Sequence, residues 1–201
     1  MNKPQIGSGH VSIGGDFGRV FDAEDYMTMV NALDEATVVL RAHLVLEEFL
    51  NIWGARATAT EDLFEGGFVP FKTKLFICKN LGFHSEFAEV FDRVNTIRNR
   101  YSHQRKYKLE DSALDGLRNA VDALPSIHPL LPCEQFEIYL EGQDASGIRK
   151  GFTYTWATAD IKKRMALVQV VLVLKLVHWM QQEFNSRGIK YNLVVWPAGT
   201  Q

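Results

Sequence analysis

Apolar residues recur at three- or four-residue steps through most of this chain, which is the spacing that gives an α-helix one buried face. Capping residues and glycine or proline stops divide this pattern into about five segments. We therefore expect an all-α fold, an antiparallel helical bundle. The predicted helices run from Asp22 or Asp25 to about Trp53 (long or broken), from Pro70 to Asn80 or Leu81, from Ser85 through Tyr101, from Glu110 or Asp111 to Leu124, and from Asp160 to about Ser186.

The chain between the last two helices has a different pattern. Within residues 134–157, two stretches at 136–140 and 152–156 alternate apolar and polar side chains. Alternation with a period of two is typical of a half-buried β-strand, so these stretches predict a small β-hairpin before the last long helix. A short helix in this region is the alternative.

The last predicted helix is apolar on nearly all sides between Met165 and Met180. Such a helix must be buried on more than one side. We expect it to be either the central core element or part of a subunit interface. The apolar run is 16 residues long and contains Gln169, Lys175 and His178, whereas a membrane span needs roughly 18 to 20 apolar residues. We therefore expect a soluble protein with no membrane partner.

Two glycine-containing regions set the predicted domain organisation. Residues 1–21 carry glycines at positions 7, 9, 14, 15 and 18, without an apolar stretch or a GK[ST] sequence. They predict a flexible N-terminal arm rather than a signal sequence or a phosphate loop. Residues 55–69 are broken by glycine and small polar residues and predict a connection. Residues 22–201 then fit a single helical domain.

Charge and cysteine content exclude several classes of protein. A net charge of -2 and a pI near 6.3 give no overall attraction to nucleic acid or to an anionic membrane, so a local patch must hold any such partner. Cys78 and Cys133 are isolated thiols, which is typical of a reducing compartment, and we expect a cytoplasmic protein. The sequence has no CxxC, zinc framework, Walker loop or GxSxG, so we expect neither a metal nor a cofactor.

The segment 93–108 holds the cluster of residues that most suggests chemistry. From Arg98 to Lys108 the chain has five Lys or Arg residues, one His and no acid. Such a cationic patch can hold a phosphate backbone, although a basic helix end that complements its own dipole has the same composition. The candidate phosphate or RNA contacts are Arg100, Arg105, Lys106 and Lys108, and the candidate catalytic residues are Arg98, Asn99 and His103.

Arg98 and His103 can form a joint site only under one condition. On an ideal helix Arg98 lies at the edge of the apolar face beside Ile97, and His103 lies about 140° further round. The two side chains meet only if the helix ends or kinks between them, or if a second copy of the chain brings one to the other. Otherwise we expect both to make ion pairs or hydrogen bonds, with Glu47, Glu48 or backbone carbonyls as partners.

His43, Glu47 and Asn51 follow one another at four-residue steps and form a polar ridge along the first long helix. A histidine and a glutamate at this spacing are half of a metal site. No second pair accompanies them, which favours a solvated or hydrogen-bonded ridge. Glu48 lies beside the ridge and is a candidate partner for a nearby cation. The lysines of the next helix are expected to face solvent: Lys72, Lys74 and Lys79.

Several short phrases point to a known family. They are LRAHLVLEEFL at 40–50, FKTKLFICKNLGF at 71–83, IRNRYSH at 97–103, the capped helix to Leu124 and the late helix from Asp160. Together they resemble the mannitol-operon-repressor-like proteins, which are small all-helical bacterial proteins, over roughly residues 22–185. The same residues resemble the wider HEPN group of helical domains. The HEPN signature is an arginine, often followed by a polar residue, and then a histidine after four to six intervening positions. Arg98, Asn99 and His103 match it, with four residues between the arginine and the histidine.

The HEPN resemblance implies a metal-independent endoribonuclease, in which two protomers place their Arg98 and His103 around one RNA backbone. His103 would handle the proton of a ribose 2′-hydroxyl or of the leaving oxygen. Arg98 would stabilise charge on the phosphoryl oxygens, and Asn99 would orient one of these groups. The products would be a 2′,3′-cyclic phosphate and a 5′-hydroxyl. A toxin variant of the group has a tyrosine two positions after the histidine, where this chain has Arg105.

The resemblance to mannitol-repressor-like proteins implies a function of another class, transcription regulation by an interaction protein. The sequence has no helix-turn-helix with a basic recognition helix, so we expect a protein partner rather than direct operator binding. For both functions we expect a homodimer. A ribonuclease would be the toxin of a toxin–antitoxin pair, with an antitoxin as its protein partner.

Overall fold

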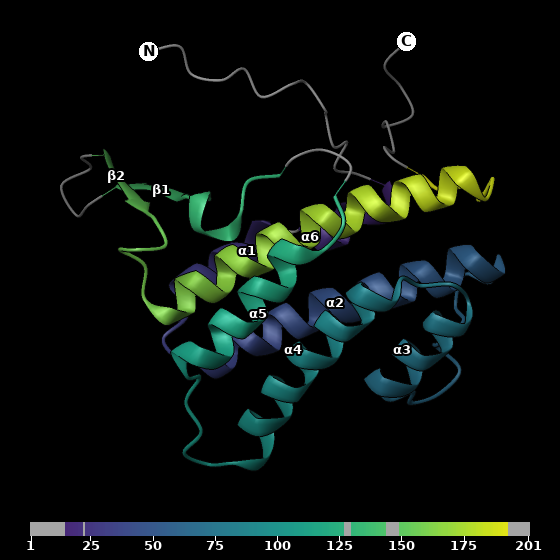
Figure 1. Cartoon of the computed structure of the whole chain (residues 1–201), viewed down its shortest axis with the longest axis horizontal. Helices are drawn as coiled ribbons and strands as arrows, with labels where there is room; N and C mark the ends of the chain where they lie inside the picture. Colours follow the sequence, from purple (N-terminus) through teal and green to yellow (C-terminus); the bar gives the residue numbers. More distant parts are fainter. Residues whose placement is uncertain (1–14, 22, 127–129, 144–148, 193–201) are drawn as a thin grey trace, which may run out of the picture.

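The protein is a bundle of α-helices with one small β-hairpin (Figure 1). The computed structural model describes residues 15–21, 23–126, 130–143 and 149–192. The predicted all-α class and the hairpin before the last long helix are confirmed. In chain order the elements are η1 (Gly15–Phe21), α1 (Ala23–Asn31), α2 (Glu35–Thr58), α3 (Phe71–Asn80), α4 (Ser85–His103), α5 (Asp111–Ala123), η2 (Cys133–Gln135), β1 (Ile138–Gln143), β2 (Arg149–Tyr154) and α6 (Ile161–Ser186).

The first predicted helix is broken into α1 and α2. Asp34 has an extended backbone, and its Oδ1 accepts a hydrogen bond of 2.8 Å from the Thr37 amide, which caps α2. The amide and the hydroxyl of Thr37 both donate to this carboxylate and lower the pKa of Asp34. Asp25, one of the two predicted caps, lies inside α1 and pairs with Arg41 of α2 at 2.7 Å. The other predicted cap, Asp22, lies outside the described residues.

Two helix boundaries differ from the sequence prediction. α2 continues past Trp53 and stops at Ala59, whose left-handed backbone has a φ of 55°. The connection to α3 is therefore shorter than predicted. α4 is capped by His84 rather than by Ser85, because the His84 Nδ1 accepts the Glu86 amide at 3.3 Å. A histidine ring nitrogen takes the place of the expected hydroxyl.

Residues 15–21 do not belong to a flexible arm. They form the 3-10 helix η1, whose Phe17 and Val20 are completely buried in the core against α2. The Asp16 amide donates to the Asn192 carbonyl at 2.8 Å, which ties this helix to the chain after α6. The prediction is wrong for this stretch because the glycines around two buried apolar residues obscure their helical spacing. The rest of the predicted arm lies outside the described residues.

α2 and α6 form the centre of the core, and the other helices pack around them (Figure 1). α2 contacts η1, α1, α3, α4 and α6, and α6 contacts α1, α2, α5 and η2. Of the two roles expected for α6, the structure shows the central core element. Among the described residues α6 is the one helix long and apolar enough to cross a membrane, and 67% of that stretch is buried inside the protein.

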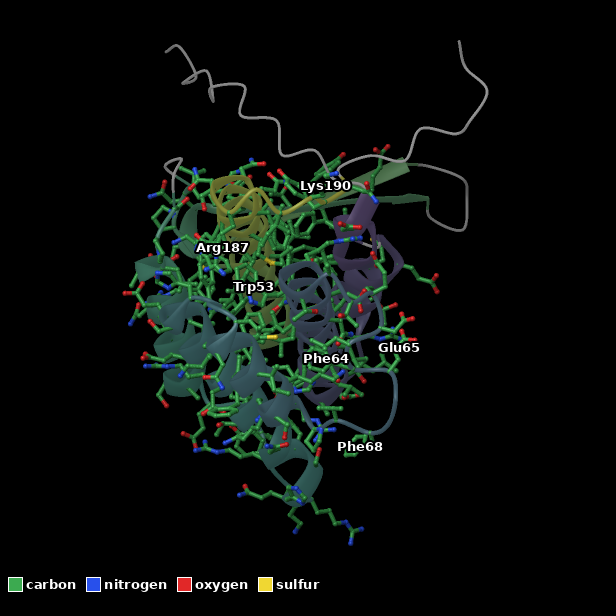
Figure 2. All side chains as sticks on the ribbon, turned by 90° about the vertical axis from the view of Figure 1, so that its right-hand side faces the viewer. Trp53, Phe64, Glu65, Phe68, Arg187 and Lys190 are labelled. Carbon is green, nitrogen blue, oxygen red and sulfur yellow. The ribbon has the colours of Figure 1, made fainter. Side chains whose placement is uncertain are left out.

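Aromatic rings gather where α2 and α6 meet. Trp53 stacks on Trp179 and Phe184, with ring centroids 4.9 and 5.4 Å apart. The guanidinium of Arg187 lies over the Trp53 ring at 5.2 Å and donates to the Leu81 carbonyl at 2.9 Å (Figure 2). Arg187 therefore joins the end of α6 to the end of α3.

A buried lysine interrupts the apolar surface of α6. Lys175 is 5% exposed, and its ammonium donates to the backbone carbonyls of Val121, Asp122 and Leu124 at 2.9, 2.8 and 3.0 Å. These carbonyls lie at the end of α5, where helix carbonyls lack the usual amide donor four residues on, and among the described residues only the Val121 carbonyl also accepts a backbone amide, that of Leu124 at 3.2 Å. Lys175 thus caps α5, and burial lowers the pKa of its ammonium.

β1 and β2 pair as antiparallel strands, with Leu140 opposite Phe152, which excludes the short helix considered as an alternative. The hairpin lies beside the bundle rather than within it (Figure 1). Trp156, two residues after the end of β2, joins the hairpin to the bundle. The guanidiniums of Arg118 on α5 and Arg164 on α6 lie over its ring at 5.2 and 5.6 Å.

Candidate functional site

α4 runs without a break from Ser85 to His103. The helix neither ends nor kinks between Arg98 and His103, so within one chain the two side chains leave it about 140° apart. The His103 side chain is exposed, whereas Arg98 is half-buried next to Ile97. A single chain therefore does not bring the arginine and the histidine together, and only a second copy could do so.

Arg98 and Asn99 are the two predicted catalytic residues that do meet. The Arg98 Nη1 donates to the Asn99 Oδ1 at 3.1 Å. The Arg98 Nε is buried and has no hydrogen-bond partner among the described residues. One N–H of this guanidinium therefore lacks an acceptor within the described part of the chain.

The predicted phosphate contacts lie on an exposed cationic surface where α4 ends and the loop to α5 begins. Arg100 lies over the ring of Tyr107 at 5.9 Å. Within the described parts of the chain, none of the arginines and lysines of this surface pairs with a carboxylate. We call the surface the basic end, and its exposed members are Arg100, His103, Arg105, Lys106 and Lys108.

Glu35, the first residue of α2, holds the loop that carries the basic end. Its Oε2 accepts the Tyr101 hydroxyl at 2.5 Å and the Leu109 amide at 2.8 Å. The Tyr101 hydroxyl oxygen also accepts the Leu109 amide at 2.8 Å. Burial, and then the bond to Glu35, raises the pKa of Tyr101. One carboxylate thus fixes both sides of the loop.

The polar ridge of α2 is hydrogen-bonded to the neighbouring helices. The His43 Nε2 and the Asn95 Oδ1 of α4 lie 3.2 Å apart. The Lys74 ammonium of α3 donates to the Glu47 carboxylate at 2.8 Å and to the Asn51 amide oxygen at 3.1 Å. The ridge therefore joins α2 to α3 and α4, as the hydrogen-bonded alternative predicted.

The sequence predicts Glu47 and Glu48 as possible partners for the arginine and histidine of α4. The structure places the Glu47 carboxylate on Lys74 instead, and Asn51 donates to the Glu48 carboxylate at 3.2 Å. Lys74 is buried rather than solvent-facing, which corrects the sequence prediction, because its ion pair compensates for the loss of water. In the described part of the chain, no group of three His, Cys, Asp or Glu could hold a metal ion.

His43 is a buried histidine that the sequence did not connect with Arg98. It is 5% exposed and packs on the Phe71 ring, with centroids 4.2 Å apart. Burial lowers the pKa of His43, and the charge of Arg98 acts in the same direction, against the bond to Asn95. Because Arg98 and His43 lie on different helices, no local pattern could have shown that they interact.

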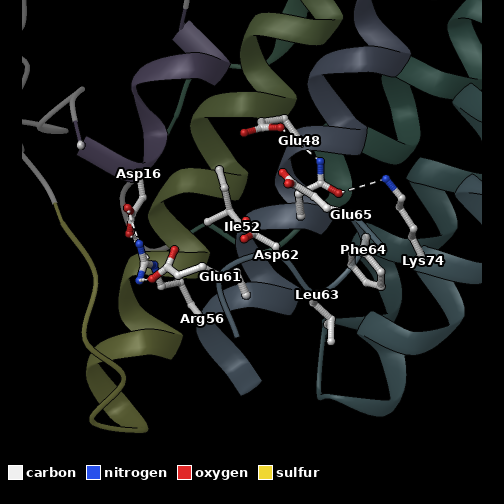
Figure 3. A pocket seen from close by; sticks show the side chains of 13 residues that line it. Asp16, Glu48, Ile52, Arg56, Glu61, Asp62, Leu63, Phe64, Glu65 and Lys74 are labelled. Atoms are coloured by element: carbon white, nitrogen blue, oxygen red, sulfur yellow. Dashed lines mark hydrogen bonds and ion pairs between the residues drawn. The ribbon is translucent and has the colours of Figure 1, made fainter. Parts of the chain in front are cut away.

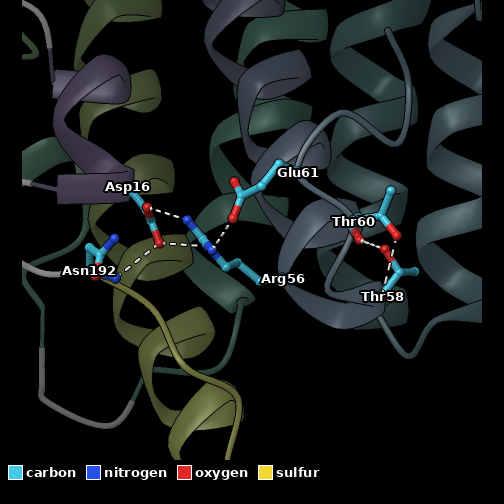
Figure 4. A network of polar contacts seen from close by, with 7 residues as sticks. Asp16, Arg56, Thr58, Thr60, Glu61 and Asn192 are labelled. Carbon is cyan, nitrogen blue, oxygen red and sulfur yellow. Dashed lines mark hydrogen bonds and ion pairs between the residues drawn. The ribbon is translucent and has the colours of Figure 1, made fainter. Parts of the chain in front are cut away.

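A cavity of about 360 Å³ lies beside α2, between η1 and the loop that precedes α3 (Figure 3). Arg56 at its edge pairs with Asp16 at 2.7 Å and with Glu61 at 2.8 Å (Figure 4), and the bond to Asp16 is the main cause of the raised pKa of Arg56. The sequence did not predict this cavity because its charged groups come from separate segments. They are Asp16, Glu48, Glu61, Asp62, Glu65, Arg56 and Lys74.

The chain matches no family model, no curated protein and no solved structure. Its likeness to the mannitol-repressor-like proteins and to the HEPN group therefore rests on the sequence phrases alone.

Proposed function

We propose that this chain is a regulatory or interaction protein of the mannitol-repressor-like type that acts through a protein partner. The observation that carries the proposal is the unbroken course of α4 through His103. Arg98 and His103 leave this helix about 140° apart. One chain therefore does not place an arginine at a phosphoryl oxygen and a histidine at the adjacent ribose hydroxyl at the same time.

The position of the positive charge supports a protein partner over direct binding to an operator. Proteins that read operators place their base contacts along a helix that enters the major groove. In this chain the exposed cations occupy the last turn of α4 and the loop that follows it, at the tip of the bundle where α4 ends (Figure 1). These cations do not form a row along one helix that could follow the major groove of DNA.

A HEPN-type metal-independent ribonuclease, the toxin of a toxin–antitoxin pair, is the second candidate function. One observation favours it, which is the hydrogen bond from the Arg98 Nη1 to the Asn99 Oδ1, because it brings together two of the three residues that the HEPN resemblance assigns to the site. This function requires a homodimer, because only the second copy can bring its His103 to Arg98 and Asn99. A monomeric mass by light scattering at micromolar concentration would exclude it.

The test is incubation of the purified full-length chain with a labelled single-stranded RNA in EDTA, beside His103→Ala and Arg98→Ala. We expect all three proteins to leave the RNA intact. Cleavage by the unsubstituted chain that both substitutions abolish, with 2′,3′-cyclic phosphate ends, would establish the ribonuclease instead. Circular dichroism spectra of the variants check that both keep their helices.

A further inference from the structure

The basic end carries positive charge without counter-charge of its own. Residues 93–109 contain no Asp or Glu, although the whole chain has a net charge of -2. The nearby carboxylate of Glu35 is occupied by the Tyr101 hydroxyl and the Leu109 amide. Neighbouring like charges repel one another, so an anionic partner would be attracted to this surface and steered towards it.

The loop of the basic end is ordered before any partner binds. In addition to the two hydrogen bonds that the Glu35 carboxylate accepts, the Gln104 amide donates to the Arg100 carbonyl at 2.8 Å, and the Tyr107 amide donates to the Gln104 carbonyl at 2.9 Å. A surface that is already ordered loses less conformational entropy on binding. The cations of the loop are thus held near one another in the free protein.

Two tyrosine rings next to the basic end pack against other side chains of the same chain. Tyr101 and Tyr107 pack edge to face, with centroids 4.7 Å apart, and Arg100 covers the Tyr107 ring. Surfaces that hold single-stranded nucleic acid combine cations with aromatic rings on which bases stack. Because both tyrosine rings are occupied, the basic end favours an acidic polypeptide over RNA.

An exposed leucine lies two residues before the glutamate that holds the loop. Leu33 is 95% exposed and lies two residues before Glu35, whose carboxylate holds the loop. The Lys162 ammonium of α6 donates to the carbonyls of Ala32 and Leu33 at 2.8 and 3.4 Å, which holds this turn. Apolar side chains next to charged groups are typical of protein–protein interfaces, whereas a phosphate backbone has no use for a leucine.

We propose that the basic end and Leu33 form the docking surface for an acidic segment of a partner protein. Its carboxylates pair with Arg100, Arg105, Lys106 and Lys108, and an apolar side chain of the segment packs on Leu33. The inference rests on the proposed function and adds the docking surface and the chemistry of the partner.

The test uses the full-length chain and a fluorescein-labelled peptide of Glu-Glu-Leu repeats, with binding followed by anisotropy. We expect binding that weakens as salt is added and that falls at least about tenfold in Arg105→Glu/Lys106→Glu/Lys108→Glu. The matched control is Lys72→Glu/Lys79→Glu/Lys190→Glu, which changes the net charge equally at exposed lysines elsewhere (Lys190 is labelled in Figure 2) and should bind within about twofold of the unsubstituted chain.

A second pair of variants tests the apolar contact. We expect Leu33→Ser to weaken peptide binding about threefold or more, because it removes apolar contact area without touching the core. Leu44→Ser, at a leucine of α2 that is 49% exposed, is the matched control and should leave binding unchanged. Equal effects of the two substitutions would overturn the role of Leu33.

Three outcomes overturn the docking proposal. The first is no peptide binding at low salt, and the second is equal loss of binding in the two triple variants. The third is tighter binding of a labelled oligouridylate in EDTA that is lost in the same loop variant, which would assign the surface to nucleic acid. Cleavage of that oligouridylate would instead refute the proposed function. A gel that separates intact from cleaved oligouridylate therefore distinguishes failure of the docking proposal from failure of the proposed function.

Discussion

Arg98 and His103 lie five residues apart on the unbroken helix α4 and have different surroundings. Arg98 is half-buried and donates to Asn99, whereas His103 is exposed at the end of the helix. Because the two side chains leave the helix about 140° apart, a single chain cannot apply both to one phosphate. A ribonuclease site made of these residues would therefore need two copies of the chain.

Replacement of Lys175 should destabilise the protein. Lys175→Met keeps most of the apolar stem but removes the ammonium that donates to the carbonyls of Val121, Asp122 and Leu124. We expect the free energy of unfolding to fall by about 2–4 kcal/mol, measured by urea denaturation. Lys79→Met, at an exposed lysine of α3, is the control and should change it by less than about 0.5 kcal/mol. A Lys175→Met protein as stable as the control would contradict this role.

The buried His43 predicts a loss of stability in acid. Its pKa is lowered by burial and by Arg98, below the ordinary value of 6.5. As pH falls below 6.5, the unfolded chain takes up a proton at this position before the folded chain does, so protons favour unfolding. The free energy of unfolding should therefore decrease on acidification, by up to about 1.4 kcal/mol per pH unit from this group.

Denaturation of the unsubstituted chain and of His43→Gln between about pH 7 and pH 5 checks this prediction. The glutamine keeps a group that can hydrogen-bond Asn95 and does not titrate, so the variant should show the flatter profile. Parallel profiles for the two proteins would show that His43 does not carry the pH dependence.

Glu35 should control the order of the loop at the basic end. Glu35→Ala removes the acceptor of the Tyr101 hydroxyl and of one bond from the Leu109 amide. We expect a loss of about 1–3 kcal/mol in the free energy of unfolding and faster hydrogen exchange at the Leu109 amide. Glu89→Ala, at an exposed glutamate on α4, should change neither quantity. An unchanged rate of hydrogen exchange at the Leu109 amide in Glu35→Ala would contradict the role of Glu35 in holding this loop.

The parts of the fold that the sequence predicts are those set by neighbouring residues. α6 begins where the Asp160 Oδ1 accepts the Lys163 amide at 2.9 Å, and Gly188 follows its end with a φ of 65°. Both signals act within a few residues, so the sequence displays them directly. For η1, by contrast, the structure shows Phe17 and Val20 buried against α2, a contact between segments that are far apart in the sequence.

The candidate site could be predicted only where its members are contiguous. The basic end is visible in the sequence because its cations follow one another from Arg100 to Lys108. The hydrogen bond between Glu35 and Tyr101 joins residues 66 positions apart, and the ion pair between Glu47 and Lys74 joins residues 27 positions apart. Such pairs depend on how the helices pack, so the periodicity of single helices cannot reveal them.

The most direct test of the central claim is the rate at which labelled single-stranded RNA is cleaved in EDTA. The comparison includes the unsubstituted chain, Arg98→Ala, His103→Ala and an equimolar mixture of the two variants. We predict that all four samples match a protein-free control. The contrary result is cleavage that falls at least about a hundredfold in each variant and returns in part in the mixture, because two copies would then complete one site.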